Sequence, residues 1–254
     1  RIIMKTKKST CAIIAAVIIA VVAAVILALN SNFVFIGGEG IRKDSAEVEI
    51  DFMDKKIGRD LKRLDRFSKM DSLWLKFISD DDNTEYIPRV KSVERLTIPF
   101  SKIKSTDFLN NFENVRYLHF VSSNIDFENL SDEASIEKLE LWSCNTQNFD
   151  KVGKCPAIKE ISIFQSNLSG EGMDYISEQF DSQILSEFDY VTALEITNMS
   201  ISDISGFLDM KSLKDLSVKR YTLDEPPITE TQAEELRKAG INVTVDNEKQ
   251  NFGN

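Results

Sequence analysis

An internal repeat with a period near 22 residues is the feature that most constrains how this 254-residue chain can fold. Six segments share an apolar-x-apolar pattern: RLTIPFSKI, YLHFVSSNI, KLELWSCNT, EISIFQSNL, ALEITNMSI and DLSVKRYTL. Their central residues are Leu96, Leu118, Leu139, Ile161, Leu194 and Leu216, with spacings of 22, 21, 22, 33 and 22. Further copies centre on Leu73 and Leu75 before these segments and on Val243 and Val245 after them. A sustained period of this length predicts stacked structural units that share one buried core.

This pattern resembles the leucine-rich-repeat family, whose consensus is L-x-x-L-x-L-x-x-N-x-L. The repeat length, and the stretch SISDISGFLDMKSLKDLSV at 200–218, are similar to the internalin-type subclass. In that stretch Ile201, Ile204 and Leu208 occupy the I-x-x-I-x-x-x-L positions of the subclass. The resemblance covers roughly residues 67–245. It implies an α/β solenoid, in which leucine-rich repeats form a right-handed superhelix with a concave parallel β-sheet and short helices or turns on the convex side.

The asparagine of the family consensus is largely missing. Its slot holds Ser101, Ser123, Cys144, Ser166, Met199 and Tyr221. Because a serine hydroxyl can bond backbone groups at a turn, we expect the repeats to stack with a weaker internal hydrogen-bond ladder.

Irregular segments interrupt and close the repeats. The long interval between Ile161 and Leu194 contains SGEGMDYISEQFDSQILSEFDY, whose apolar spacing predicts a longer helix on the convex face. Thr231 and Glu234 form a capping-box pattern for a short helix that ends near Gly240. The following INVTV predicts a closing strand, so we expect a C-terminal cap.

The N-terminal region predicts a membrane anchor. Nineteen uncharged residues at 11–29 nearly match the thickness of a hydrocarbon core, and the lysines in the stub at 1–10 favour a cytoplasmic N-terminus. We therefore expect one transmembrane helix at 11–29, a flexible linker at 30–44, and a leucine-rich-repeat ectodomain with N- and C-terminal caps at 45–254. We expect a single-pass cell-membrane protein with an extracellular domain. A cleaved signal peptide, which would leave the domain secreted, is the alternative.

The net charge limits the classes of partner, and the cysteine content indicates the class of protein. The net charge is -10, and the first 29 residues carry +4, so the remainder carries -14. An acidic surface repels phosphate backbones, which argues against nucleic acid as a partner. Three cysteines are too few for a disulfide framework or cysteine-clustered caps, which favours a bacterial surface protein. Cys144 and Cys155 fall in core-directed slots, as small buried hydrophobes or as a disulfide pair.

The candidate binding residues come from alternation along the strands. The leucine positions face the core and their neighbours face outward, which brings both tryptophans and several other aromatic side chains to the concave face. The candidate ligand-binding residues are Trp74, Phe77, Phe100, Tyr117, His119, Trp142, Phe164 and Arg220. Aromatic residues are enriched at binding hot spots. We therefore expect a membrane-anchored recognition module that binds a protein partner on this face.

Other functions are weaker readings of the same residues. A glycan could stack on the aromatic side chains, and a structural subunit of an envelope assembly could bury them. Catalysis is not expected, because His119 is the only histidine and no serine or cysteine lies around it in a motif-like setting. We expect no cofactor and no metal site, and the sequence leaves the oligomeric state open.

Overall fold

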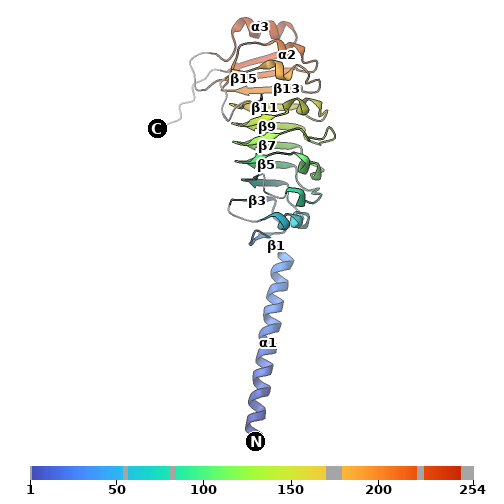
Figure 1. Cartoon of the computed structure of the whole chain (residues 1–254), viewed down its shortest axis with the longest axis vertical. Helices are drawn as coiled ribbons and strands as arrows, with labels where there is room; N and C mark the ends of the chain where they lie inside the picture. Colours follow the sequence, from blue (N-terminus) through green and yellow to red (C-terminus); the bar gives the residue numbers. More distant parts are fainter. Residues whose placement is uncertain (1, 54–56, 80–83, 170–178, 222–225, 247–254) are drawn as a thin grey trace, which may run out of the picture.

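A parallel sheet of nine strands forms the body of the protein (Figure 1). The computed structural model describes residues 2–53, 57–79, 84–169, 179–221 and 226–246, without the side chains of 2–13 and 30. The strands, in spatial order, are β3 (Glu47–Asp51), β4 (Ser72–Lys76), β5 (Arg95–Pro99), β7 (Tyr117–Val121), β9 (Lys138–Trp142), β11 (Glu160–Phe164), β13 (Ala193–Thr197), β15 (Asp215–Lys219) and β16 (Asn242–Asp246). Spatial order equals chain order, so the sheet grows strand by strand along the sequence.

The register of the sheet follows the repeat. One apolar residue from every strand stacks at the same level: Val48, Leu73, Leu96, Leu118, Leu139, Ile161, Leu194, Leu216 and Val243. All of them are buried except Val243, which is partly buried on the last strand. Complete burial of one such side chain contributes about 1.5–3 kcal/mol, so this layer is a large share of the core. The strands therefore begin and end where the 22-residue spacing places them.

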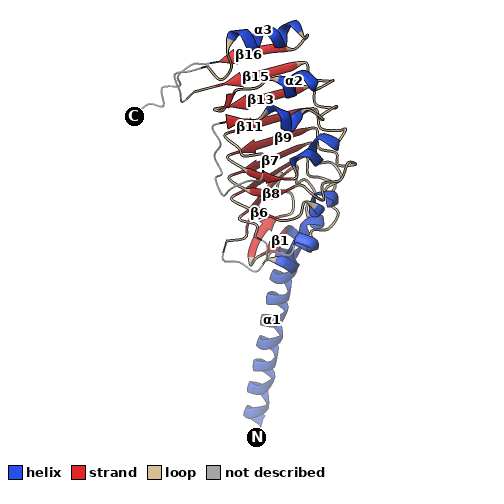
Figure 2. Ribbon diagram, turned by 45° about the horizontal axis from the view of Figure 1, so that its top comes forward, coloured by secondary structure: helices blue, strands red, loops and turns tan. Residues whose placement is uncertain are grey.

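Short strands and helical turns form a second layer behind the sheet (Figure 2). Three strands make a small parallel sheet: β6 (Lys102–Ile103), β8 (Asn124–Asp126) and β10 (Asn145–Gln147). A parallel pair joins β12 (Gln179–Phe180) and β14 (Ser200–Ile201). The 3-10 helices are η1 (Gly58–Arg66), η2 (Thr84–Tyr86), η3 (Asp107–Asn111), η4 (Phe149–Lys154) and η5 (Ser182–Leu185). The α-helices are α1 (Ile2–Asn32), α2 (Ser205–Asp209) and α3 (Glu230–Lys238).

This architecture corrects the expected fold class. The protein has a nine-stranded parallel sheet with mixed α and β elements, in place of the leucine-rich-repeat α/β solenoid with a transmembrane helix. The reason lies in the connections between strands. Most of them form 3-10 turns and short strand pairs in place of α-helices. In the described ranges beyond α1, only α2 and α3 are α-helical.

The long interval before β13 differs from its prediction in the same way. Its residues 170–178 lie outside the described part of the chain. The described remainder forms β12 and η5, where we expected one longer helix. The carboxylate of Asp181 accepts a hydrogen bond from the Gln183 N–H, which begins the 3-10 turn, and Leu185 and Phe188 are buried beneath it.

The C-terminal helix α3 begins earlier than predicted. Its N-cap is Thr229, whose hydroxyl accepts a hydrogen bond from the Gln232 N–H while the Gln232 side chain accepts one from the Thr229 N–H. The capping box therefore uses Thr229 and Gln232, whereas we had assigned it to Thr231 and Glu234. A glutamine serves this role as well as a glutamate, because it needs only a side-chain oxygen. The closing strand β16 is present as predicted.

Within the residues that the structure describes, no helix combines the length and the apolar character needed to cross a membrane. The predicted transmembrane helix at 11–29 is wrong on this finding, and so is the single-pass, signal-anchored placement with an extracellular domain.

The segment expected to be a flexible linker contains an antiparallel hairpin. Strand β1 (Phe33–Ile36) pairs with β2 (Glu39–Arg42), and Val34 and Ile36 are buried against the core. The hairpin is tied to η1, because the Arg63 guanidinium donates to the Phe35 carbonyl oxygen at 2.6 Å. Residues 33–42 therefore close the N-terminal end of the core.

Buried serines form hydrogen bonds to the preceding turn at the turns that follow β5, β7 and β11. The Ser101 hydroxyl accepts from the Ile78 N–H at 3.0 Å, and the Ser123 hydroxyl accepts from the Ser101 N–H at 2.9 Å. The Ser166 hydroxyl accepts from the Cys144 N–H at 3.0 Å. All three serines are buried. Each hydroxyl thus satisfies a backbone N–H of the preceding turn, which the missing asparagines would otherwise do.

Replacement of one ladder serine tests this arrangement. We expect Ser123→Ala to lower the free energy of unfolding by about 1–3 kcal/mol, because it leaves the buried Ser101 N–H without an acceptor. Chemical denaturation of the full chain measures the change. Ser202→Ala removes an exposed hydroxyl and should change stability by less than about 0.5 kcal/mol. Equal stability of both variants would show that the ladder contributes nothing.

Candidate functional site

The candidate site is the face of the nine-stranded sheet that points away from the core, which we call the outer face. Three positions of each strand point to it, because successive side chains of a strand lie on opposite sides. The parallel register aligns these positions into three columns that cross the sheet. The surface chemistry therefore depends on which side chains neighbour one another from repeat to repeat.

Seven of the eight predicted binding residues lie on or beside the outer face. Phe100 is 53%, Tyr117 39% and Trp142 46% exposed, so these three rings are open to a partner. Four others are half-buried: Trp74, Phe77, His119 and Phe164. We call the six aromatic residues Trp74, Phe77, Phe100, Tyr117, Trp142 and Phe164 the aromatic band.

Phe77 and Phe100 form one stacked pair at the ends of β4 and β5. Their ring centroids are 5.3 Å apart with an interplanar angle of 20°. Both residues have left-handed backbone angles, with φ of 60° and 55°. The N–H of Phe77 still donates to the Pro99 carbonyl, and that of Phe100 to the Val121 carbonyl. The strand-to-strand ladder thus continues through a strained residue, and the turn holds both rings beside the face.

Trp142 is the centre of a second group. The His119 ring meets it edge-on with centroids 4.8 Å apart, and the Phe164 ring lies 6.2 Å away on its other side. His119, Trp142 and Phe164 come from three consecutive strands, so the sheet register holds the tryptophan between its neighbours. An aromatic side chain braced in this way loses little conformational entropy on binding a ligand.

Cationic side chains lie over the rings of Tyr117 and Trp74, the remaining two residues of the aromatic band. The Arg95 guanidinium lies 5.1 Å from the Tyr117 ring centroid, and the Lys76 ammonium lies 5.7 Å from that of Trp74. Such contacts are worth about 0.5–1 kcal/mol at exposed sites. The aromatic band is therefore a set of separate groups interrupted by charge, and not one continuous apolar stripe.

Arg220 does not belong to the outer face. It is buried, and its Nη1 donates to the Ser200 hydroxyl at 2.6 Å. Strand β15 ends at Lys219, so Arg220 occupies the turn slot of its repeat, beneath the surface. Selecting Arg220 as an outward residue was wrong. Alternation counted from Leu216 and Val218 puts this slot on the core side, and tertiary contacts decide whether the residue there is buried.

His119 is held neutral by its surroundings. Burial lowers the pKa of His119 below its ordinary value of 6.5, the nearby Glu140 carboxylate opposes this, and Lys138 adds to it. The Nδ1 atom of His119 lies 4.0 Å from the Glu140 carboxylate, and Nε2 is buried without a hydrogen-bond partner among the described groups. The imidazole thus serves as a packing surface for Trp142.

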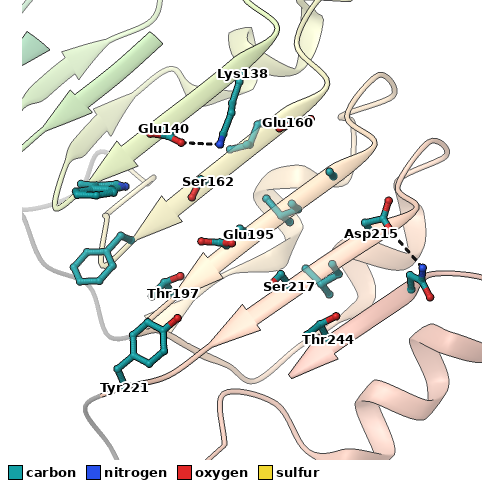
Figure 3. Close-up of a pocket in the computed structure, with 17 residues that line it drawn as sticks. Lys138, Glu140, Glu160, Ser162, Glu195, Thr197, Asp215, Ser217, Tyr221 and Thr244 are labelled. Carbon is teal, nitrogen blue, oxygen red and sulfur yellow. Dashed lines mark hydrogen bonds and ion pairs between the residues drawn. The ribbon is translucent and has the colours of Figure 1, made fainter. Parts of the chain in front are cut away.

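A depression of about 590 Å³ lies on the outer face over β9, β11, β13, β15 and β16 (Figure 3). Its labelled side chains include the acids Glu140, Glu160, Glu195 and Asp215, and Lys138 and Tyr221 lie towards opposite ends. Trp142 and Phe164 also line it. The volume falls within the roughly 300–1,000 Å³ typical of ligand pockets.

Sequence reasoning missed the depression because it ranked the outer columns by their aromatic residues alone. Small side chains line the hollow between the acids: Ser162 and Ser217 flank Glu195, Thr244 follows Ser217, and Ala193 and Thr197 share the outward side of β13 with Glu195. An alignment of the repeats on their central leucines contains this signal, as small residues that alternate with acids in the outward positions. Glu160 and Tyr221 had not been selected as candidates.

The two described cysteines do not contribute to the outer face. Cys144 and Cys155 are both buried and unbonded, so the alternative of a disulfide between them is wrong. Burial raises the pKa of the Cys144 thiol to about 12 and that of Cys155 to about 11. In the described ranges, no three His, Cys, Asp or Glu side chains are grouped closely enough to hold a metal ion.

The ionisation of His119 can be measured directly, because it is the only histidine of the chain. We expect an NMR titration of its imidazole to show a midpoint below 6.5. As the pH falls, His119 is therefore protonated near pH 6.5 in the unfolded state but only at a lower pH in the folded state. The stability contributed by neutral His119 is therefore present above pH 6.5 and decreases as the pH falls from 6.5 through the folded pKa.

Two variants check the cause of this shift. Glu140→Gln removes the neighbour that raises the pKa and should lower the midpoint further, whereas Lys138→Met should raise it. Both variants act on exposed or half-buried groups, so the fold should survive them. A wild-type midpoint at or above 6.5 would contradict the buried environment described for His119.

The chain matches no protein-family model and no curated protein. Its likeness to leucine-rich repeats is thus a likeness of sequence pattern, without a matching family to carry a function over. What the protein does is therefore inferred from the geometry and charge of the outer face.

Proposed function

We propose that this protein is a binding module that recognises a protein partner through the aromatic band on its outer face. The observation that carries the proposal is the exposure of Phe100, Tyr117 and Trp142 on one face of one sheet. Exposed aromatic side chains on a shared surface are typical of interaction sites.

The support of these rings favours recognition over simple surface exposure. Trp142 is held between His119 and Phe164, and Phe100 is stacked on Phe77. The sheet beneath them is a continuous parallel ladder with a buried apolar layer. A partner therefore meets side chains that are already in place, which reduces the entropy lost on association.

A glycan is the second candidate ligand, because the half-exposed indole of Trp142 could stack on a sugar ring beside the carboxylates of the depression. Interruption of the band by the cations Arg95 and Lys76 favours a protein, whose mixed polar and apolar surface can complement both kinds of group.

The test uses the full chain as bait against a displayed library of short random peptides and against a glycan array. We expect selected peptides to lose affinity by about 2 kcal/mol, roughly thirtyfold, for Trp142→Ala and by a smaller amount for Phe100→Ala. Isothermal titration with one selected peptide measures the change.

Leu208→Ala is the matched control, since it truncates a 37% exposed apolar side chain on α2, away from the outer face. Circular dichroism should show all three variants folded. Equal peptide binding by the wild type, Trp142→Ala and Phe100→Ala would remove the aromatic band as the binding site. Binding to glycans alone would replace the protein partner by a carbohydrate.

A further inference from the structure

The depression in the C-terminal half of the outer face combines an aromatic wall with an excess of negative charge. Trp142, Phe164 and Tyr221 line the side where the strands end, and the hollow itself lies over small side chains. The aromatic wall and the acids belong to the same cavity of about 590 Å³ (Figure 3).

Internal ion pairs neutralise only part of the charge. Lys138 pairs with Glu140 at 2.8 Å, and Lys219 pairs with Glu195. Glu160 is exposed and forms no ion pair among the described residues. With Asp215 included, four acids face two bases, which leaves a net charge of -2 at the depression.

The remaining charge lies where a ligand would meet it. Asp215 accepts a hydrogen bond, 3.3 Å, from the Asn242 amide and forms no ion pair among the described residues. Glu160 and Asp215 begin strands β11 and β15, on either side of Ala193, whose methyl group leaves space between them. The first column of the face therefore presents two carboxylates with a gap between them.

We propose that this depression receives a lysine or arginine side chain carried by an extended segment of the protein partner. The charged head of such a side chain enters the gap over Ala193 and reaches the carboxylates of Glu160 and Asp215, while an apolar residue of the same segment packs on the wall of Trp142, Phe164 and Tyr221. The inference rests on the proposed function and adds to it the chemistry of the partner.

Charge complementarity decides between classes of occupant. A basic segment gains from the net charge of -2 at the depression and from the net charge of -10 on the chain, which attracts it from a distance. An acidic or phosphate-bearing ligand is repelled by both. A neutral glycan gains from the aromatic wall but gains nothing from the excess charge.

The experiment repeats the selection of displayed peptides on the full chain, and the selected sequences are compared with the unselected library. We expect enrichment of lysine and arginine next to apolar residues. For one enriched peptide, Glu160→Gln and Asp215→Asn should each weaken binding roughly threefold to tenfold, and wild-type binding should weaken as the NaCl concentration rises.

Glu234→Gln is the matched control, because it removes the same charge from an exposed position on α3 and should leave the affinity within about twofold of the wild type, as expected for a distant surface charge. Equal weakening by Glu234→Gln would reduce the effect to overall charge and overturn the proposed site. Enrichment of neutral or acidic peptides would overturn it as well.

Further outcomes separate this inference from the proposed function. If Phe100→Ala weakens binding while Glu160→Gln and Asp215→Asn do not, the aromatic band is a binding site and the depression is not. If only Glu160→Gln and Asp215→Asn weaken binding, the depression is the site and the wider band is not. Glycan binding without any peptide enrichment, or no enrichment of either kind, overturns both.

Discussion

The parallel hydrogen-bond ladder of the nine-stranded sheet is the constraint on which the rest of the structure depends. Every strand of this sheet between the edge strands β3 and β16 is bonded to a strand on each side, and the same ladder sets one apolar side chain of each repeat above the next. A slip of one residue in any strand would turn its core side chains outward. Burial of the apolar layer and pairing of the backbone therefore stabilise the same register.

The hydrogen-bond ladder of the sheet continues one residue beyond six of its strands, into the turn that follows. Phe77, Phe100, Ser122, Ser143, Gln165 and Asn198 all adopt left-handed backbone angles there. Each still donates its N–H to the next strand, and the buried serines that follow bond the preceding turn. A left-handed angle costs about 1–2 kcal/mol for a residue other than glycine, and hydrogen bonding on both sides offsets this cost.

The same register also arranges the outward side chains, because equivalent positions of successive repeats lie side by side on the surface. Because outward positions align into columns, the outer face divides by what the repeats carry at those positions. The strands from β4 to β9 present large rings with cations over two of them. The strands from β11 to β16 present small side chains between carboxylates, which makes a hollow. One backbone thus supports two surfaces of different shape and charge, and their difference underlies both proposals for the ligand.

The 22-residue spacing of apolar residues determined where the strands of the main sheet lie and which side chains face the core, because period and alternation are local properties of the chain. It also indicated that Phe100, Tyr117 and Trp142 are exposed. Only the tertiary structure decided the layer behind the sheet, the hairpin of β1 and β2, the burial of Arg220 and the hollow beside Trp142. The docking of the hairpin and the burial of Arg220 depend on contacts between residues at least 20 positions apart, those of Arg63 with Phe35 and of Arg220 with Ser200, whose partners a local pattern does not specify.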